Sequence, residues 1–427
     1  MSLAHPSLDQ MRGELHVGED FLAKYNRPGP RYTSYPTAPI WNDAFGPADL
    51  ERVHEEAERV RTPVSLYMHI PFCESLCLFC ACNVVIQKNK SVAPPYLDTK
   101  EHFHFDAESE IGIEVDPRVT SLAHLETLRK LGFNRLSMGI QDFQTEVQQV
   151  VHRIQPYEMT RDLLFAAREL GFDSINVDLI YGLPYQTAET FAHTVDQIVG
   201  LAPDRIALFS YAHVPWLKKQ QGSFAAHLPE GMHKFEIFRT GLLKFLDAGY
   251  LYIGMDHFAK PGDELAVSQQ NRTLHRNFQG YTTKAGADLY GMGITAISGI
   301  QGAYAQNYRD IPSWEKAVAE RGLATMRGYQ LSNEDRLRRA VISRLLCHTV
   351  VIKDEISREF AIDFDEHFAE ELRRLEPSRQ DGLVLLDGGE IRATWLGRIF
   401  IRNLAMVFDP YLEKQQLTAR PLFSKTL

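Results

Sequence analysis

The chain has 427 residues, of which 44% are hydrophobic, and a formal net charge of −9. This length fits two or three domains, or one large barrel with an appendage, and the apolar content can fill a substantial core. The acidic balance argues against general nucleic-acid binding, and the lack of 18 consecutive apolar residues argues against a membrane span. The polar, acidic N-terminus resembles neither a signal nor a transit peptide, and five cysteines do not make a disulfide framework, so we expect a cytoplasmic protein.

The first 64 residues are predicted to form an N-terminal arm and a helix. Residues 24–39 are rich in Pro, Gly, Tyr and Arg, which excludes a regular helix. Residues 48–60 have the periodicity of a helix. The simplest interpretation of the first stretch is an arm that wraps over the protein surface.

A loop after a predicted strand holds most of the cysteines. Residues 66–71 read as a short buried strand that ends at a proline, so the following residues leave the carboxyl end of a strand. Ligands bind at that end in parallel α/β folds. Within the next residues lie four of the five cysteines: Cys73, Cys77, Cys80 and Cys82.

The cysteine spacing, C-x3-C-x2-C, indicates the kind of metal site. Thiolates hold iron–sulfur clusters, and three protein ligands would leave one iron of a four-iron cluster open, as in other catalytic metal sites. The apolar residues Leu76, Leu78 and Phe79 suit a cluster shielded from water. The alternatives are a disulfide or a zinc knuckle with Cys82 or His69 as the fourth ligand, although zinc sites usually have two well-separated ligand pairs.

Strand-like and helix-like segments alternate after the cysteine loop, which predicts a parallel sheet. The predicted strands are residues 110–115, 135–140, 174–181, 205–211 and 250–255. The predicted helices are residues 120–131, 157–170, 187–201 and 233–248. Polar residues recur at the carboxyl ends of the strands: Glu114, Asp116, Gln141, Asp142, Asp178, His213, Asp256 and His257. Each alone is as readily a capping or loop residue, but their recurrence predicts a site at this end.

The αβ alternation ends near residue 280. Residues 280–298 are rich in glycine but contain no GxGxxG motif, which gives a Rossmann fold little support. From about residue 330 the sequence predicts helices at 333–348, 364–375 and 394–408 and a hairpin at 382–393. This order predicts a small winged-helix-like domain in which Cys347 is a core thiol, and fold alone does not imply DNA binding.

The cysteine loop resembles that of the radical S-adenosylmethionine (SAM) enzymes. The segments YMHIPFC and CLFCACN are similar to one family among them, the oxygen-independent coproporphyrinogen III oxidases. The resemblance continues in KYNRPGPRYTSYPTAP (24–39), IEVDPR (113–118), NRLSMGIQDF (134–143), NVDLIYGLP (176–184), IGMDHFA (253–259) and LHRNFQGYTT (274–283). It implies an α/β fold with three parts: an N-terminal arm (1–64), a (β/α)6-type radical SAM barrel (65–327) and the winged-helix-like C-terminal domain (328–427).

The resemblance also implies roles for individual residues. Cys73, Cys77 and Cys80 would hold a [4Fe–4S] cluster, and Cys82 would not. The residues that would contact SAM, of which two molecules are implied, are Tyr67, Phe79, Glu114, Gln141, Arg153, Asp178, Ala212 and Ile297. Glu114 and Asp178 can accept hydrogen bonds from ribose hydroxyls or an ammonium group, and Arg153 can bind a carboxylate with two donors. Without the resemblance, Arg153 is almost as readily a surface ion pair at a helix end.

The implied reaction is an oxidative decarboxylation in heme biosynthesis. Two propionates of coproporphyrinogen III become vinyl groups, which gives protoporphyrinogen IX, and an electron donor of unknown identity reduces the cluster. The cofactors carry this chemistry, while the protein binds, orients and excludes water. In the arm, Arg31, Tyr32 and Tyr35 could meet substrate carboxylates. We expect a monomer, because no long apolar stripe is left once the barrel helices are assigned.

One segment of the family pattern has no counterpart in this chain. The GGGTP motif, which holds the SAM amino group in the family, is absent. Only 28 residues separate Glu110 from Cys82, whereas a helix, a strand and a second helix need about 40. We therefore predict a partial barrel that lacks one strand, joined near residues 99–102, so that two strands pair directly or become sheet edges. A homologue that binds a cluster or porphyrin with little or no turnover is the alternative to an active oxidase.

Overall fold

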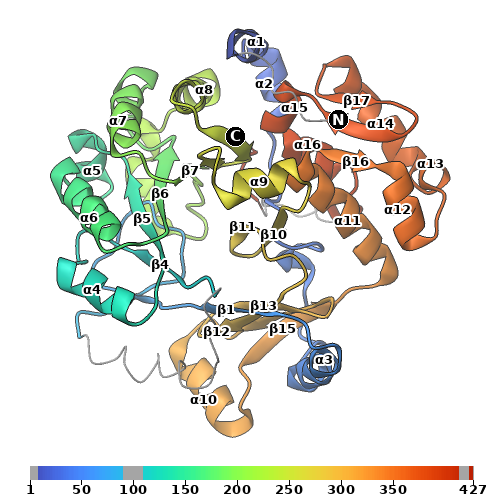
Figure 1. Ribbon diagram of the computed structural model, residues 1–427, viewed down its shortest axis with the longest axis horizontal. Helices are drawn as coiled ribbons and strands as arrows, with labels where there is room; N and C mark the ends of the chain where they lie inside the picture. The colour runs from blue at the N-terminus through green and yellow to red at the C-terminus, as the bar shows by residue number, and fades with distance from the viewer. Residues whose placement is uncertain (1–7, 90–108, 413–422, 427) are drawn as a thin grey trace.

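The computed structural model describes residues 8–89, 109–412 and 423–426, and its larger sheet contains the αβ units (Figure 1). The strand order is β4-β5-β6-β7-β9-β8. Strands β4 to β7 are parallel neighbours, and β9 is antiparallel to both β7 and β8. The strands are β4 (Gly112–Val115), β5 (Arg135–Gln141), β6 (Ser174–Tyr181), β7 (Arg205–Ser210), β8 (Leu251–Gly254) and β9 (His257–Ala259).

The end of this sheet differs from a purely parallel arrangement. After β8 the chain turns at Met255, which has a positive φ of 52°, and returns as β9. Strand β9 then inserts between β7 and β8. The sheet therefore has a mixed edge, which is common in large α/β folds.

Helices cover one face of the larger sheet (Figure 1). They are α4 (Leu122–Lys130), α5 (Thr145–Val150), α6 (Tyr157–Glu169), α7 (Ala188–Leu201) and α8 (Gly231–Asp247), with the 3-10 helix η5 (Lys219–His227) before α8. On β5, Leu136, Met138 and Ile140 are at most 2% exposed and pack in the same cluster as Leu164 of α6. Because alternate side chains of a strand point to opposite faces, the intervening polar residues face the interior of the molecule.

A second sheet contains the strand that leads to the cysteines. Its order is β1-β12-β13-β14-β15, in which β1 is parallel to β12 and the other pairs are antiparallel. Its strands are β1 (Val64–Met68), β12 (Asp288–Met292), β13 (Ile297–Ile300), β14 (Ala303–Asn307) and β15 (Thr325–Gln330). The accompanying elements are α3 (Pro47–Val60), α9 (Glu264–Gln270), the hairpin β10 (His275–Asn277) and β11 (Gly280–Thr282), and α10 (Ile311–Arg321). Leu50 of α3 packs against Ile300 of β13.

The two sheets do not close into a barrel. Among the residues that the structure describes, β1 and β4 are the end strands of separate sheets, which is one of the two outcomes expected when a barrel strand is missing. The partial α/β barrel predicted from the sequence is confirmed. The predicted junction near residues 99–102 lies outside the described residues.

The C-terminal residues form helices around a three-stranded antiparallel sheet of order β16-β18-β17. The elements are α11 (Asn333–His348), β16 (Val350–Ile352), α12 (Lys353–Phe360), α13 (Phe364–His367), α14 (Ala369–Gln380), β17 (Val384–Leu386), β18 (Glu390–Ala393), α15 (Trp395–Ile399) and α16 (Ile401–Met406). Two predicted helices are interrupted, at Phe368 and at Phe400, where the backbone leaves helical geometry and the ring is buried. Burial of these rings outweighs the local preference for one continuous helix. The domain boundary at residue 328 stays a prediction.

One hydrophobic core joins both ends of the chain to the larger sheet. Met11 of α1 (Leu8–Glu14) lies in the same buried cluster as Phe238 of α8 and Leu404 of α16, as do residues of α2 (Glu19–Tyr25). Arg402 of α16 donates a hydrogen bond to the carbonyl of Pro30 (2.9 Å) in the N-terminal arm. Between Tyr25, where α2 ends, and the short 3-10 helix η1 (Ala38–Ile40), the chain forms no helix, as the composition of residues 24–39 predicts.

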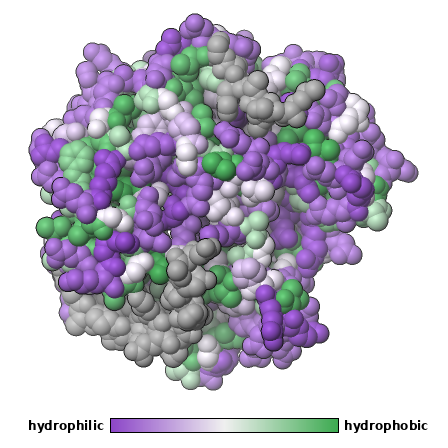
Figure 2. All heavy atoms as spheres, in the orientation of Figure 1, coloured by the Kyte–Doolittle hydropathy of each residue, from purple (hydrophilic) through white to green (hydrophobic). Residues whose placement is uncertain are grey.

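The face of the molecule seen in Figure 2 carries mostly hydrophilic side chains, with hydrophobic ones in small groups. Single exposed apolar side chains, such as Leu217 at 72% exposure, are ordinary on protein surfaces. Within the described ranges, no helix is both long and apolar enough to cross a bilayer.

Candidate functional site

The cysteine loop leaves the carboxyl end of β1 and is anchored at several points. Its first cysteine ends β2 (Phe72–Cys73), which pairs in parallel with β3 (Val85–Ile86). The backbone N–H of Leu78 donates to the carbonyl of Val151 (3.0 Å), and Nε2 of Gln221 donates to the carbonyl of Phe79 (3.0 Å). All the loop thiols are free; Cys77 is buried, Cys73 and Cys80 are half-buried, and Cys82 is exposed.

Two arginines and an aspartate surround Cys77. Arg118 Nη2 lies 3.2 Å from Cys77 Sγ, and Arg153 Nη1 lies 3.7 Å from it. Asp116 accepts hydrogen bonds from Arg118 Nη2 (2.6 Å) and Arg153 Nη1 (3.3 Å). Burial opposes ionisation of Asp116, but hydrogen bonds from Arg118 and the charge of Arg153 outweigh it and lower the pKa of Asp116. Cys77 Sγ therefore lies among two guanidinium groups and the carboxylate that they share.

The chemistry of the thiols fits an iron–sulfur cluster. A hydrogen bond with Cys82 and the charge of Lys218 lower the pKa of Cys80 to about 6, against the effect of burial. Burial and the nearby Cys80 and Cys77 raise the pKa of Cys73, so the three sulfur atoms are close enough to interact. In the described part of the chain, no three His, Cys, Asp or Glu side chains converge as a single ion requires. A cluster does not need such convergence, because its thiolates bind separate irons.

The surroundings of His69 do not favour the zinc alternative. Its Nδ1 atom shares a hydrogen bond with the hydroxyl of Tyr67 (3.1 Å), and its Nε2 atom shares one with the carbonyl of Asn83 (3.0 Å). Both ring nitrogens are therefore occupied, although a metal ligand needs one of them free. Tyr67, a predicted SAM contact, is fixed at the same time beside the cysteine loop.

Two acidic residues lie beside this loop: Glu114 on β4, which is partly exposed to solvent, and the half-buried Asp178 on β6. Burial and the charge of Glu114 raise the pKa of Asp178 to about 7, against a 2.8 Å hydrogen bond from Asn176 and the charge of Arg153. Burial also raises the pKa of Glu114, which the charges of Arg153 and His69 oppose. Perturbed carboxylates that share a charged partner are typical of binding and catalytic sites.

A β-bulge reorients Gln141 at the end of β5. The register between β5 and β6 shifts between Gly139 and Gln141, and Gln141 has a positive φ of 73°. Its Oε1 atom is buried and has no hydrogen-bond partner among the described residues. Arg153 Nη2 completes this corner by donating to the carbonyl of Gly139 (2.7 Å). Gln141 thus offers a buried acceptor that a bound group would satisfy.

The other predicted SAM residues lie further apart. Phe79 packs in a small apolar cluster with Tyr211, and Ala212 follows in the loop after β7. Ile297 is on β13 in the second sheet, in a separate apolar cluster. The structure therefore brings Tyr67, Glu114, Arg153 and Asp178 close to the cysteine loop. Ile297 lies on the same sheet as Tyr67, two strands away, and its backbone is next to Gly291, the strand partner of Tyr67. That these residues contact SAM stays a prediction.

Arginines gather between the N-terminal arm and the larger sheet. Arg31 pairs with Asp256, and burial with the charges of Arg402 and Arg276 lowers the pKa of Arg31 to about 9. The same surroundings lower the pKa of His257 to about 3, through burial and the charges of Arg276 and Arg31. This region therefore has a strongly positive potential, which attracts anions.

Sequence reasoning missed part of this site. It anticipated Arg31 but did not single out Arg276, Arg402 or Arg118, although the first and last belong to the segments LHRNFQGYTT and IEVDPR. Tyr32 and Tyr35, expected near substrate carboxylates, lie in the core: the hydroxyl of Tyr32 donates to Asp409 (2.9 Å), and Tyr35 is 1% exposed.

Comparison with known proteins agrees with this geometry. Profiles of the Radical SAM superfamily and of the HemN C-terminal domain match residues 92–198 and 331–400. The oxygen-independent coproporphyrinogen III oxidases of Salmonella typhimurium and Escherichia coli are each 43% identical over 438 residues, which cover 92% of this chain and 95% of theirs. That of Synechocystis sp. is 40% identical over 454 residues, which cover 94% and 97%.

A solved structure supports the same family, and the length of the alignment shows where the chain differs from its relatives. The structure of coproporphyrinogen III oxidase (HemN) from Escherichia coli, described as a radical SAM enzyme, matches with a TM-score of 0.86 and 42% identity, covering 89% of this chain and 97% of that one. The alignment of 438 positions is longer than the 427-residue chain, so the relatives carry residues that this chain lacks. These similarities show that the chain belongs to the oxygen-independent coproporphyrinogen III oxidase family of radical SAM enzymes.

Proposed function

We propose that this protein catalyses the oxygen-independent oxidative decarboxylation of coproporphyrinogen III to protoporphyrinogen IX with a [4Fe–4S] cluster and SAM. The observation that carries the proposal is the three-cysteine loop beside Arg153, Glu114 and Asp178 at the carboxyl ends of the strands. Further support comes from relatives named for this activity, which align with 92% of this chain at 43% identity.

The loop thiolates Cys73, Cys77 and Cys80 hold the cluster in this proposal, and Cys82 stays outside the ligand set. When bound, the cluster and SAM would supply the radical that removes a hydrogen from a propionate β-carbon. An external donor would supply the electron that reduces the cluster, and an electron acceptor would take the electron released as CO2 leaves. Arg153, whose donors already reach Asp116 and the Gly139 carbonyl, positions a carboxylate through charge-assisted hydrogen bonds.

The carboxylates bind the cofactor's polar groups. Glu114 and Asp178 accept hydrogen bonds from hydroxyl and ammonium groups, and Asp178, with a pKa of about 7, binds a cation best when it is ionised. The predicted contacts come from both sheets, with Glu114 and Asp178 on the larger one and Tyr67 and Ile297 on the second. We also propose that two SAM molecules bind, as the family resemblance implies.

Without the GGGTP segment, the ammonium group of SAM needs other acceptors. Residues 84–109 contain no glycine, so no equivalent glycine-rich loop exists there. The unpartnered Oε1 of Gln141 and the carboxylate of Glu114 are acceptors near the cysteine loop. Binding without turnover is therefore the less favoured reading, since relatives with 43% identity are oxidases.

The substrate is anionic, although the whole chain has a net charge of −9. Arg31, Arg276 and Arg402 provide the local positive charge that its propionates require. The pKa of Arg31 is lowered only to about 9 and that of Arg402 to about 10, so both stay cationic at neutral pH. Charge of this kind raises both the encounter rate and the affinity of an anion.

We also propose a cytoplasmic monomer that does not bind nucleic acid. The five cysteines are all free, as expected in a reducing compartment, and the hydrophilic face in Figure 2 carries no large apolar patch. The acidic net charge is unfavourable for contact with phosphate backbones.

An anaerobic turnover assay tests the proposed reaction. Cluster-reconstituted protein would be mixed with SAM, a strong reductant and coproporphyrinogen III, and 5′-deoxyadenosine and protoporphyrinogen IX would be followed together. Both products should form with the wild type and neither above background with Cys77→Ala. A cluster-loaded wild type that yields neither product would overturn the proposal in favour of a binding protein.

A further inference from the structure

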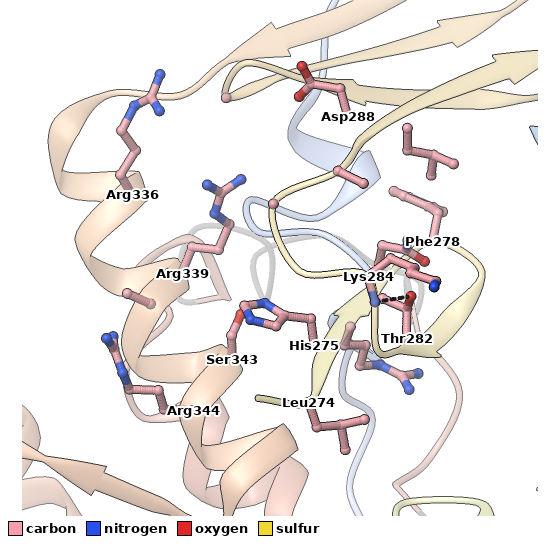
Figure 3. Close-up of a pocket in the computed structure, with 18 of the residues that line it drawn as sticks. Leu274, His275, Phe278, Thr282, Lys284, Asp288, Arg336, Arg339, Ser343 and Arg344 are labelled. Carbon is pink, nitrogen blue, oxygen red and sulfur yellow. Dashed lines mark hydrogen bonds between the residues drawn. The ribbon is translucent and has the colours of Figure 1, made fainter. Parts of the chain in front are cut away.

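A cavity lies between α11 and the β10–β11 hairpin, with residues of β12 to β14 on its far side (Figure 3). Its volume is about 870 Å³, within the usual range of small-molecule pockets. The cysteines of the loop do not line it. Its lining includes the apolar residues Leu274, Phe278, Leu289 and Phe360 and the cations Arg272, Arg276, Lys284, Arg336, Arg339 and Arg344.

The three acidic side chains in the lining already have partners within the protein. Glu355 pairs with Arg272 (3.4 Å), and Glu359 pairs with Arg344 (2.5 Å). The third, Asp288, accepts hydrogen bonds from Gln301, at 2.9 Å from its backbone N–H and 2.7 Å from its side chain. Among the described residues, Arg276, Arg339 and Lys284 therefore have no carboxylate partner.

Helix α11 presents its cations to the cavity from one face. Arg336, Arg339 and Ser343 follow one another at intervals of three and four, which is the spacing of one helix face. In Figure 3 the side chains of Arg339 and His275 lie in the space between the helix and the opposite hairpin. Desolvation, together with the charges of Arg344 and Arg339, lowers the pKa of His275, as expected for an imidazole beside these cations.

Arg276 connects this cavity to the arginines near the N-terminal arm. Its Nε and Nη1 atoms are buried without a hydrogen-bond partner in the described residues, and its guanidinium lies over the ring of Tyr281, 4.8 Å from the centroid. Its charge also acts on Arg31 and His257. Buried donors without an acceptor are costly, and an anion that accepts from these two nitrogens would relieve this cost.

The cavity also borders the proposed cofactor residue Ile297. Gly299, which lines the cavity, follows Ile297 by two positions on β13, so both face the same side of that sheet. Phe278 lines the cavity and packs in the same apolar cluster as Ile297. Thr62 and Asp288, at the amino ends of β1 and β12, also line the cavity, whereas the cysteine loop follows the carboxyl end of β1. A ligand held here would therefore have to extend along these strands to reach the loop.

We propose that this cavity holds the two propionates of the tetrapyrrole that do not react, and that Arg339 and Arg276 bind their carboxylates. The inference rests on the proposed function: four propionates enter, two lose CO2, and two stay as carboxylates throughout. Paired cations beside apolar side chains match a ring with carboxylate arms. Arg339 is the determinant that is easiest to test, because it has no carboxylate partner to lose among the residues that the structure describes.

Binding can be measured without turnover. Coproporphyrin III and protoporphyrin IX are stable oxidised forms with four and two propionates, and protoporphyrin IX keeps only the two unreacted ones. Fluorescence titration of the reconstituted full chain should show about tenfold weaker binding of both ligands to Arg339→Gln, the loss expected for one charge-assisted contact. Arg339→Lys should recover part of it. Arg321→Gln, an exposed arginine at the end of α10, removes the same charge elsewhere and should bind as the wild type does.

Three outcomes would overturn the inference. The first is unchanged affinity in Arg339→Gln, and the second is a loss for coproporphyrin III alone, which would place the reacting propionates at Arg339. The third outcome needs no variant. It is that coproporphyrin III tetramethyl ester, whose four carboxylates are uncharged esters, binds to the wild type as tightly as the free acid does. Failure of the proposed function would appear separately, as a wild type that yields no 5′-deoxyadenosine.

Discussion

The variant Asp178→Asn tests two effects of the Asp178 charge: its cost to the stability of the fold and its contribution to SAM binding. The pKa of Asp178 is about 7, compared with 3.8 for an ordinary aspartate, which corresponds to about 4 kcal/mol of lost stability when the group is ionised. Solvent around this half-buried side chain reduces that to about 2 kcal/mol. Because the folded pKa is the higher one, the cost is fully present above about pH 7 and falls away as the pH decreases toward 4. An asparagine oxygen can still accept the bond that Asn176 donates (2.8 Å).

We therefore expect the apo Asp178→Asn protein to be more stable than the wild type by about 2 kcal/mol at pH 8 and by about a third of that at pH 5. Urea unfolding followed by circular dichroism at both pH values measures this, with the exposed Asp43→Asn as a control that should change little. Cluster-loaded Asp178→Asn should bind SAM about tenfold more weakly, because a charged acceptor is lost. A less stable variant at pH 8, or a difference independent of pH, would refute the reasoning.

Three further changes test other parts of the structure. Cys77→Ala should reduce iron and sulfide content to background whereas Cys82→Ala should keep the cluster; an iron assay that gives equal contents would contradict the ligand set. Arg118→Met removes a hydrogen-bond donor 3.2 Å from the sulfur of Cys77. It should lower the reduction potential of the cluster by about 40 mV, which equals about 1 kcal/mol for one electron. An unchanged potential in an EPR-monitored redox titration would count against this contact. Gly291→Ala would place a Cβ atom 2.5 Å from a backbone oxygen of β13 and should cost about 2 kcal/mol, whereas Gly200→Ala, with open space around it on α7, should be neutral or slightly stabilising in the same thermal melts.

Local signals explain which elements the sequence predicts well. Helix α11 has the predicted bounds because Ser332 caps its start, accepting from the backbone of Asp335 (3.1 Å), and Thr349 ends it with a φ of 59°. Strand β6 was predicted in full from its short apolar run. The insertion of β9 between β7 and β8 could not be predicted, because it depends on pairing between strands that no local pattern encodes.

The same distinction applies to the site. The thiols are clustered in the sequence, so their spacing and family resemblance identify them at once. The arginines come from positions as distant as Arg31, Arg276 and Arg402, and only the folded arrangement shows that they share one environment. Arg118 lies two residues after Asp116, and its contact with Cys77 depends on a loop 41 residues away.

The core shared by both ends of the chain makes the molecule a single cooperative unit. Met11, Phe238 and Leu404 lie in one buried hydrophobic cluster. Detaching either terminal region would therefore expose apolar surface on the rest of the protein. Thermal unfolding should therefore occur in one transition, and a cut between residues 327 and 328 should yield two insoluble fragments rather than two folded ones. Substitutions far from the cysteines, in α1 or α16, would then shorten the lifetime of the active molecule as effectively as changes beside the thiols.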